Sequence, residues 1–218
     1  MPRWLWALLA AALAAQLSWR TPEPSGERLD APAPPGVRTL RLASFGEEHA
    51  LARLLALHIQ RSDLKGDYGR LIEWLRNILE LDPRNPYPLF LAARVYAESP
   101  DPARVRLCLD FIYQEFFRDP ERRWPWLAHG ALVAKHRLGD LPLARRYASA
   151  VERYTTAPDV PLWVKQMQIF ILEDMNELEA AKIMLGGLLE SGTVKDPAEL
   201  RFLRGRLQEL ETRISGAK

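Results

Sequence analysis

The chain has 218 residues, 48% of them hydrophobic, which is enough for one folded body plus a tail or an anchor. Its 30 Lys and Arg nearly balance its 28 Asp and Glu. This balance argues against a dedicated nucleic-acid binder, which would carry a basic face. Cys108 is the single cysteine, so no disulfide within the chain is possible and cysteine usage leaves the redox compartment open.

Residues 1–20 are predicted to be a targeting or anchoring segment. Arg3 precedes the apolar run Trp4–Trp19, an order that secretory signal peptides share, and Ala12-Leu13-Ala14 supplies a cleavage site. Tryptophans at both ends of the run are typical of an uncleaved membrane anchor instead, although a helix of this length spans about 24 Å against a hydrocarbon core of about 30 Å. Two alternatives stay open: a single-pass inner-membrane anchor, or a cleaved signal with a secreted or periplasmic product. Both place the rest of the chain in the periplasm or outside.

A proline-rich linker is predicted at residues 21–36. Its sequence TPEPSGERLDAPAPP holds five prolines and almost no large apolar side chains. Such a composition favours an extended chain. At about 3.1 Å per residue the linker reaches on the order of 45 Å, far enough to hold a folded domain off a membrane surface.

Helical periodicity dominates the remainder of the chain. In GDYGRLIEWLRNILELDPRNP, residues 66–86, Asp67 is a candidate N-cap. Pro83 ends that helix, because proline disfavours helical geometry at the residue before it. The same signals predict helices at about residues 45–61, 67–81, 87–98, 102–118, 125–138, 142–154, 161–174, 177–191 and 197–214.

The pattern repeats along the chain. Acidic residues open four second helices at spacings of 34, 39 and 37 residues: Asp67, Asp101, Asp140 and Glu177. An apolar stripe follows each at matching positions: Leu71, Leu75 and Ile78; Val105, Leu109 and Ile112; Ala144, Ala148 and Val151; Ala181, Leu185 and Leu188. A period of about 34 residues or slightly more, with two helices per period, is typical of a helical-hairpin array.

In these segments the chain resembles the tetratricopeptide repeat (TPR) family. Residues 66–86 match best, with their Gly-Asp-Tyr turn and closing Asp-Pro; LGDLPLARRYASAVERY (138–154) and MNELEAAKIMLGGLLESG (175–192) follow. The unit that begins at Asp101 is longer than the family norm. The resemblance implies an all-α fold: a right-handed α-solenoid of about four helical hairpins over residues 37–194. A capping helix and tail at 195–218 complete it. Protein–protein interaction, not catalysis, is the function that the resemblance implies.

Residue types that carry catalysis or bind metals show no recognisable spacing. His129 and His136 are seven residues apart, unlike the i, i+4 pair that binds zinc on one helix. We interpret the glycines of LGGLLESG, residues 185–192, as close helix packing plus a C-terminal stop. Cys108 lies on an apolar stripe, where a buried, inert thiol is expected. The sequence therefore predicts no catalytic residue, no metal site and no cofactor.

One constellation suggests a binding groove. In arrays of this kind the first helix of each pair lines the concave side. Aligning the pairs at their turns places equivalent residues in four levels: Tyr87, Trp126 and Trp163; Phe90, His129 and Gln166; Arg94, Val133 and Phe170; and Glu98, His136 with Arg137, and Glu173 with Asp174. Exposed aromatic residues anchor peptides or partner helices. The alternative is that Trp124, Trp126 and Trp163 wedge between neighbouring pairs.

From these features we expect an exported, membrane-tethered scaffold or assembly factor. It would bind a segment of an unidentified protein partner in the concave groove and contact the membrane through Trp4–Trp19. No nucleic acid and no small-molecule substrate are expected. Two alternatives remain: a permanent accessory subunit of a membrane complex, or a helical-solenoid cell-wall enzyme, which would need a cleft acid such as Glu98 or Glu173.

Overall fold

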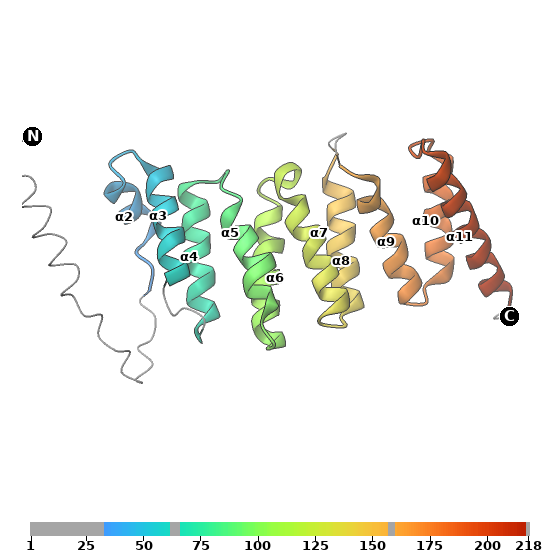
Figure 1. Ribbon diagram of the computed structural model, residues 1–218, viewed down its shortest axis with the longest axis horizontal. Coiled ribbons are helices and arrows are strands. Elements are labelled where there is room, and N and C mark those ends of the chain that lie inside the picture. Colours follow the sequence, from blue (N-terminus) through green and yellow to red (C-terminus); the bar gives the residue numbers. More distant parts are fainter. Residues whose placement is uncertain (1–32, 62–65, 157–159, 217–218) are drawn as a thin grey trace, which may run out of the picture. The chain divides into compact units, whose positions relative to one another are not determined.

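The computed structural model describes residues 33–61, 66–156 and 160–216 (Figure 1). Every described residue belongs to one compact unit, Pro32–Lys218. The predicted anchor at 1–20 and most of the linker therefore lie outside the described residues. Among the helices that are described, none combines the length and the apolar character needed to cross a membrane.

The described part of the chain is all-helical and contains no strand. Its α-helices are α2 (Val37–Ala43), α3 (Glu48–Arg61), α4 (Tyr68–Leu81), α5 (Tyr87–Phe90), α6 (Pro102–Phe116), α7 (Pro120–His136), α8 (Leu141–Tyr154), α9 (Leu162–Asp174), α10 (Leu178–Glu190) and α11 (Pro197–Gly216). After α5 come a π-helical segment, η2 (Leu91–Val95), and a 3₁₀ segment, η3 (Tyr96–Glu98). With α5, η2 and η3 taken together, each predicted helix has a counterpart, and α2 is an additional one.

Acidic side chains begin the second helices as predicted. Asp67, Asp101 and Asp140 each accept a hydrogen bond, 2.9 to 3.0 Å long, from a backbone amide two or three residues further on. These bonds satisfy amides that have no partner within the helix. Glu177, at the equivalent place before α10, forms no cap bond through its side chain. Its carboxylate instead accepts two hydrogen bonds from Arg145 of α8, at 2.7 and 2.8 Å.

Each helix packs mainly on its neighbours in the sequence. The contacting pairs include α3 with α4, α6 with α7, α7 with α8, α8 with α9, α9 with α10, and α10 with α11. Some contacts join elements that are not neighbours in the chain: α2 packs on α4, α4 packs on α6, and η2 packs on α6 and α7. In Figure 1 the labelled helices from α2 (blue) to α11 (red) follow one another in chain order along the described body.

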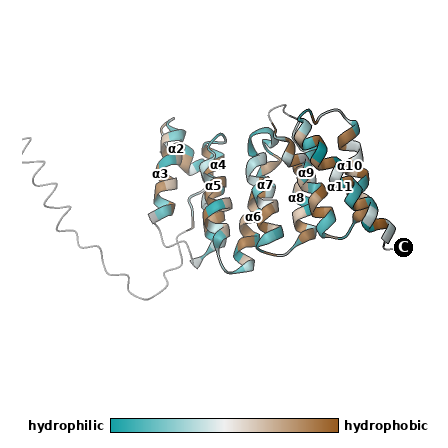
Figure 2. Ribbon diagram, turned by 45° about the vertical axis from the view of Figure 1, so that its right-hand side comes forward, coloured by the Kyte–Doolittle hydropathy of each residue, from teal (hydrophilic) through white to brown (hydrophobic). Residues whose placement is uncertain are grey.

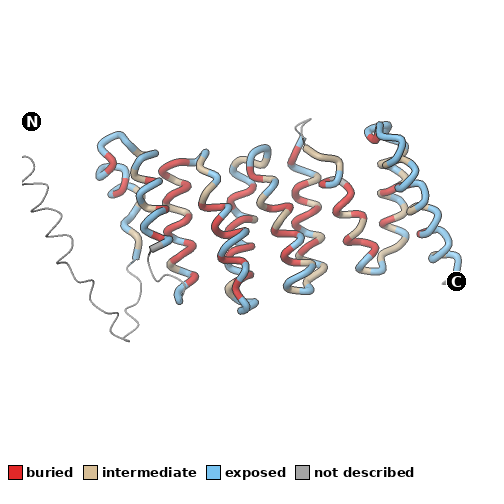
Figure 3. Tube along the Cα trace, viewed as in Figure 1, coloured by how far each residue is buried: buried red, intermediate tan, exposed pale blue. Residues whose placement is uncertain are grey.

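The predicted apolar stripes form the core. Hydrophobic and hydrophilic residues interleave along the helices (Figure 2), and the buried positions recur with helical spacing (Figure 3). Stripe residues that are at most 1% exposed are Leu71, Leu75, Ile78, Val105, Leu109, Ile112, Ala144, Ala148, Val151, Ala181 and Leu185. Leu188 is partly buried against the cluster that includes Leu185. Cys108 is also buried, as predicted.

The glycines of α10 have a different role from the one predicted. A Cβ atom added at Gly186 or Gly187 would meet no atom within 4 Å. The prediction of close helix packing at these glycines is therefore wrong. The predicted stop is confirmed, because Gly192 follows the C-cap residue Ser191 with a φ of 66°. Glycine adopts this left-handed conformation at little cost.

Candidate protein-binding surface

Side chains of the first helices contact one another from pair to pair. These helices are α3, the α5–η2–η3 segment, α7 and α9, with α11 next in order. We call the contacting side chains of the middle three the first-helix face: Tyr87, Phe90, Arg94, Glu98, Trp124, Trp126, His129, Lys135, Arg137, Trp163, Gln166, Phe170, Glu173 and Asp174. Ten of the eleven predicted groove residues belong to it, and the eleventh, His136, is exposed at the end of α7.

Aromatic rings connect α5 to α7. Tyr87 stacks on Phe90 with ring centroids 6.0 Å apart, and Phe90 meets Trp126 edge-on at 6.1 Å. The Tyr87 hydroxyl also accepts a hydrogen bond from the Gln60 amide of α3. Phe90 is 38% exposed, and Tyr87 and Trp126 are half-buried. These rings therefore contact neighbouring helices and still present part of their surface to solvent.

A second aromatic pair connects α7 to α9. It joins Trp163, which is 47% exposed, to Trp124 with ring centroids 6.1 Å apart. The predicted alignment paired Trp163 with Trp126. The difference arises because α7 begins at Pro120 and contains Pro125, so Trp124 is already helical. Residues two apart on a helix point about 200° away from each other, so Trp124 and Trp126 serve opposite neighbours.

Polar contacts continue the face towards the other end of these helices. A guanidinium nitrogen of Arg94 lies 3.4 Å from Nδ1 of His129. Burial, followed by the Arg94 charge, lowers the pKa of His129 below its usual value. Arg137 pairs with Glu98 at 2.5 Å and donates to the Ser99 carbonyl at 3.0 Å.

The α9 end of the face is more closed. Gln166 donates to Glu199 of α11 at 2.7 Å, and Phe170 lies 6.5 Å from the ring of Phe202. Glu173 is buried and paired with Arg206. Gln166 is buried too. The structure therefore places these two predicted groove residues in contacts with α11 and not at the solvent-exposed surface.

Lys135 and Asp174 add an ion pair between α7 and α9. Glu98 and Glu173, the two acids that an enzyme hypothesis would need, are both paired with arginines. Groups of His, Cys, Asp or Glu that could hold a metal ion are not found among the residues that the structure describes.

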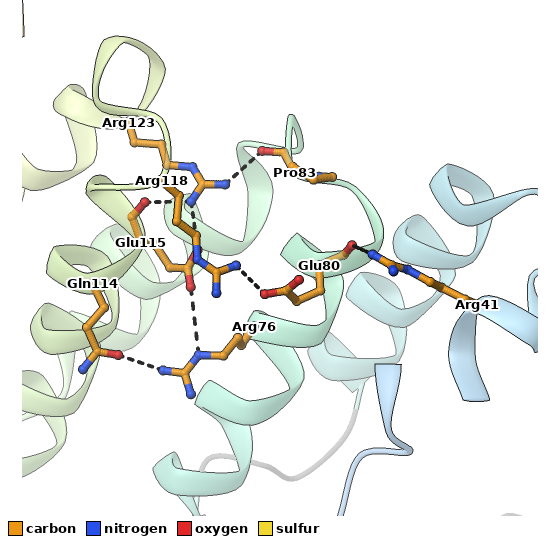
Figure 4. A network of polar contacts seen from close by, with 8 residues as sticks. All are labelled: Arg41, Arg76, Glu80, Pro83, Gln114, Glu115, Arg118 and Arg123. Carbon is orange, nitrogen blue, oxygen red and sulfur yellow. Dashed lines mark hydrogen bonds and ion pairs between the residues drawn. The ribbon is translucent and has the colours of Figure 1, made fainter. Parts of the chain in front are cut away.

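Sequence reasoning missed a buried ion pair that lies at the turn between α6 and α7 (Figure 4). One guanidinium nitrogen of Arg123 donates to both the carboxylate and the backbone carbonyl of Glu115, at 2.8 and 2.7 Å. The other nitrogen donates to the Pro83 carbonyl at 3.0 Å. Glu115 is 2% exposed and Arg123 is 5% exposed. The sequence signal that could have revealed this pair is Glu115, an acidic residue directly before Phe116 among the apolar residues of its helix.

Further arginines surround this carboxylate. Arg76 of α4 and Arg118 approach Glu115 at 3.9 and 3.7 Å, and Arg118 also pairs with Glu80. Arg41 of α2 donates to the Glu80 carbonyl at 3.2 Å. Figure 4 shows that these contacts join α2, α4 and the α6–α7 turn. We assign the cluster a structural role, because each charge is met by a partner from a neighbouring helix.

An open cavity of about 470 Å³ lies between α3 and the turn before α5. Its lining includes Arg53, Leu57, Asp82, Arg84 and Tyr87. Tyr87 is shared with the first-helix face, so the cavity extends that face towards α3.

A comparison of the chain with protein families, curated proteins and solved structures finds no match. The resemblance to the TPR family rests on the sequence segments given above and stays a prediction.

Proposed function

We propose that the chain is an exported, membrane-tethered scaffold or assembly factor, built as a right-handed α-solenoid of TPR-like hairpins. Two ion pairs support a repeating architecture. Arg106 lies five residues after the cap residue Asp101 and pairs with the next cap residue, Asp140, at 2.7 Å. Arg145 lies five residues after Asp140 and pairs with Glu177 at 2.7 Å. The same contact thus recurs between successive second helices, about one repeat apart.

The proposed binding site for a protein segment is the first-helix face. The observation that carries it is the partial exposure of aromatic rings that are already held in contact with one another. A ring that served only as a wedge would be covered, as Phe116 is in the core. Phe90 and Trp163 instead keep over a third of their surface exposed. Rigid, partly exposed aromatic side chains lose little conformational freedom on binding, which suits them as anchors.

A crosslinking experiment on native membranes tests this site. We expect the Trp126→Ala, Trp163→Ala double variant to lose crosslinked partners that the unmodified chain retains. The matched control is Leu107→Ala, Ile183→Ala, which removes exposed apolar side chains from the second helices α6 and α10. Circular dichroism and urea unfolding first establish that both variants fold. Equal recovery of the same partners by all three chains would exclude the first-helix face as the site.

The control also addresses the alternative of a permanent accessory subunit. Exposed apolar side chains on the second helices favour that alternative, because a stable interface would cover them. If the Leu107→Ala, Ile183→Ala variant loses the partners and the tryptophan variant keeps them, the accessory-subunit hypothesis replaces ours.

The tether is the other part of the proposal and rests on residues Trp4–Trp19. The mass of the mature protein separates its two forms. An uncleaved anchor keeps the full mass, whereas cleavage at Ala14 removes about 1.5 kDa. Recovery of the shorter form in a soluble periplasmic fraction would show that the chain is not membrane-tethered.

A further inference from the structure

The turn after α2 presents two large apolar side chains to solvent. Leu42 is 80% exposed and Phe45 is 95% exposed. Phe45 has a φ of 49°, a left-handed conformation that is unusual for a bulky residue, and Gly46 follows with a φ of 91°. Hydrogen bonds hold the turn: Ser44 donates through its amide to Leu40 at 2.9 Å and through its hydroxyl to Arg41 at 2.7 Å. The Phe45 ring is therefore held outward on an ordered turn.

The helix that follows has a second apolar face. Ala52, Ala56 and Ile59 are buried, on the side of α3 that serves the core. Leu54 and Leu57 are more than half exposed, and with Ala50 they share a face at i, i+4 and i+7. Exposed apolar side chains thus occur both at the turn and on the helix that directly follows it.

The last helix offers an internal comparison. The outward positions of α11 carry mainly polar and charged side chains: Arg201, Arg204, Gln208, Glu211 and Arg213. Such an outer face suits a terminal unit of a helical array that borders water. The exposed side of α3 differs, because Leu54 is 63% and Leu57 54% exposed among the polar residues His49, Arg53, His58 and Gln60, so we expect these leucines to border something other than water.

The charge and position of this end select among possible occupants. Arg38, Arg41 and Arg53 outnumber Glu47 and Glu48 across α2, its turn and α3. Apolar side chains among basic ones suit the surface of a bilayer that contains anionic lipids. The chain before Val37 consists of the predicted linker and the apolar run that would enter the bilayer, so this end of the folded body is the one joined to the membrane.

We propose that the end of α2, the turn after it and the outer side of α3, with Leu42, Phe45 and Leu54, rest on the anionic surface of the membrane. The inference rests on the proposed tether, which brings α2 to the bilayer. It adds an orientation: α2 and α3, at the N-terminal end of the array, lie against lipid, and the helices nearer the C-terminus project away from it.

Site-specific labelling of the full-length chain tests this contact. Phe45→Cys and Leu54→Cys introduce labelling sites, and Ile183→Cys on α10 is the matched control for an exposed apolar position. The native Cys108 is buried, and burial raises the pKa of its thiol to about 12, so it should not react with the label. Each variant carries an environment-sensitive fluorophore and is reconstituted into vesicles of phosphatidylcholine with or without phosphatidylglycerol.

We expect labels at positions 45 and 54 to be quenched several-fold more by spin-labelled lipid than the label at position 183, and more strongly with phosphatidylglycerol. Equal, water-like emission at all three positions in a chain that floats with the vesicles would overturn the inference and leave the tether intact. Failure to float would refute the tether and the inference together. Protection of position 45 that appears without lipid and rises with protein concentration would show that a second copy covers this face, and would overturn the lipid contact.

Phe45→Gly separates a lipid contact from a structural role. Glycine accepts the left-handed backbone, so we expect urea stability to be unchanged or higher. The lipid quenching of a label at position 54 should fall at the same time. A loss of stability with unchanged quenching would mean that Phe45 serves the fold and would count against the proposal.

Discussion

Glu115 and Arg123 form an ion pair in the interior, and their side chains are almost fully removed from solvent. Transfer of two charges out of water carries a large desolvation cost, which well-placed hydrogen bonds must offset. Here Arg123 reaches both Glu115 and the Pro83 carbonyl, so it connects segments 40 residues apart in the chain. Removing Glu115 would leave the Arg123 charge buried without a carboxylate, and removing Arg123 would leave the buried Glu115 with only its longer contacts to Arg76 and Arg118, at 3.9 and 3.7 Å.

We therefore expect Glu115→Gln or Arg123→Met to lower the free energy of unfolding by about 3–5 kcal/mol. Urea unfolding followed by circular dichroism measures the loss. Arg70→Ala is the control, because its pair with Glu73 is exposed and should contribute about 0.5 kcal/mol or less. A loss below about 1 kcal/mol for both buried variants would contradict the role assigned to this pair.

His129 should make stability depend on pH. Its pKa in the folded protein is lowered, first by burial and then by the charge of Arg94, from the ordinary histidine value of 6.5 that applies in the unfolded chain. Below that value the unfolded state binds more protons than the folded state, so stability falls as the pH drops through 6.5 and levels off below the folded pKa. In His129→Gln this part of the acid destabilisation should disappear, in urea unfolding curves recorded across that range.

At the scale of the helix, the sequence predicts elements well where local chemistry decides them. Asp67, Asp101 and Asp140 end their turns with cap bonds that depend on nearby atoms alone. The π-helical turn at Leu91–Val95 could not be predicted in this way, because its residues carry no local signal against an ordinary helix. Directly after it, the first residue of η3 is held by a distant group, because the Tyr68 hydroxyl donates to the Tyr96 carbonyl at 3.1 Å.

In the candidate surface, too, local sequence predicts some features, and others depend on residues far away in the chain. The sequence brought the right helices together, because periodicity and turn spacing determine which segments are first helices. Which side chains contact each other within the surface depends on the residue at which α7 begins. The sequence contains two prolines that could mark this start, Pro120 and Pro125, and the helix begins at Pro120. The contacts of Gln166 and Glu173 with α11 depend on tertiary packing, so spacing alone could not show that these side chains are buried.

Gly187 of α10 and Gly192, which follows the helix, predict opposite effects of the same substitution. Gly187→Ala should raise the free energy of unfolding by about 1 kcal/mol, because it improves helix propensity and meets no neighbouring atom. Gly192→Ala should lower it by about 1 kcal/mol, because alanine is strained at a φ of 66°. Urea unfolding of the two variants side by side provides the measurement. Destabilisation by Gly187→Ala would show that a partner helix approaches more closely than the structure has it.

At the scale of the whole described body, α11 completes a hydrophobic cluster that it forms with α9, α10 and the segment between α10 and α11. Leu203 and Leu210 of α11 join a cluster with Ile169, Leu185 and Val194. The charged outer side of the same helix faces water. Its two sides therefore serve different needs, burial on one and solubility on the other.

A chain that ends at residue 194 should expose this cluster. We expect increased binding of the dye ANS and aggregation at concentrations where the intact chain stays soluble, because a large apolar surface loses its cover. Arg204→Ala, Gln208→Ala on the outer side of α11 is the control and should behave like the unmodified chain. Unchanged dye binding by the truncated chain would mean that α11 is not required to cover the core.

The packing of each helix on its sequence neighbours also bears on how fast the protein folds. Contacts between neighbours close short loops, so little chain entropy is lost before the first favourable contacts form, and folding is expected to be rapid. Helix pairs near the N-terminus can therefore form without contacts from the C-terminal helices. In the proposed export, with the N-terminal part crossing the membrane first, α3 and α4 would therefore assemble while α10 and α11 are still in transit.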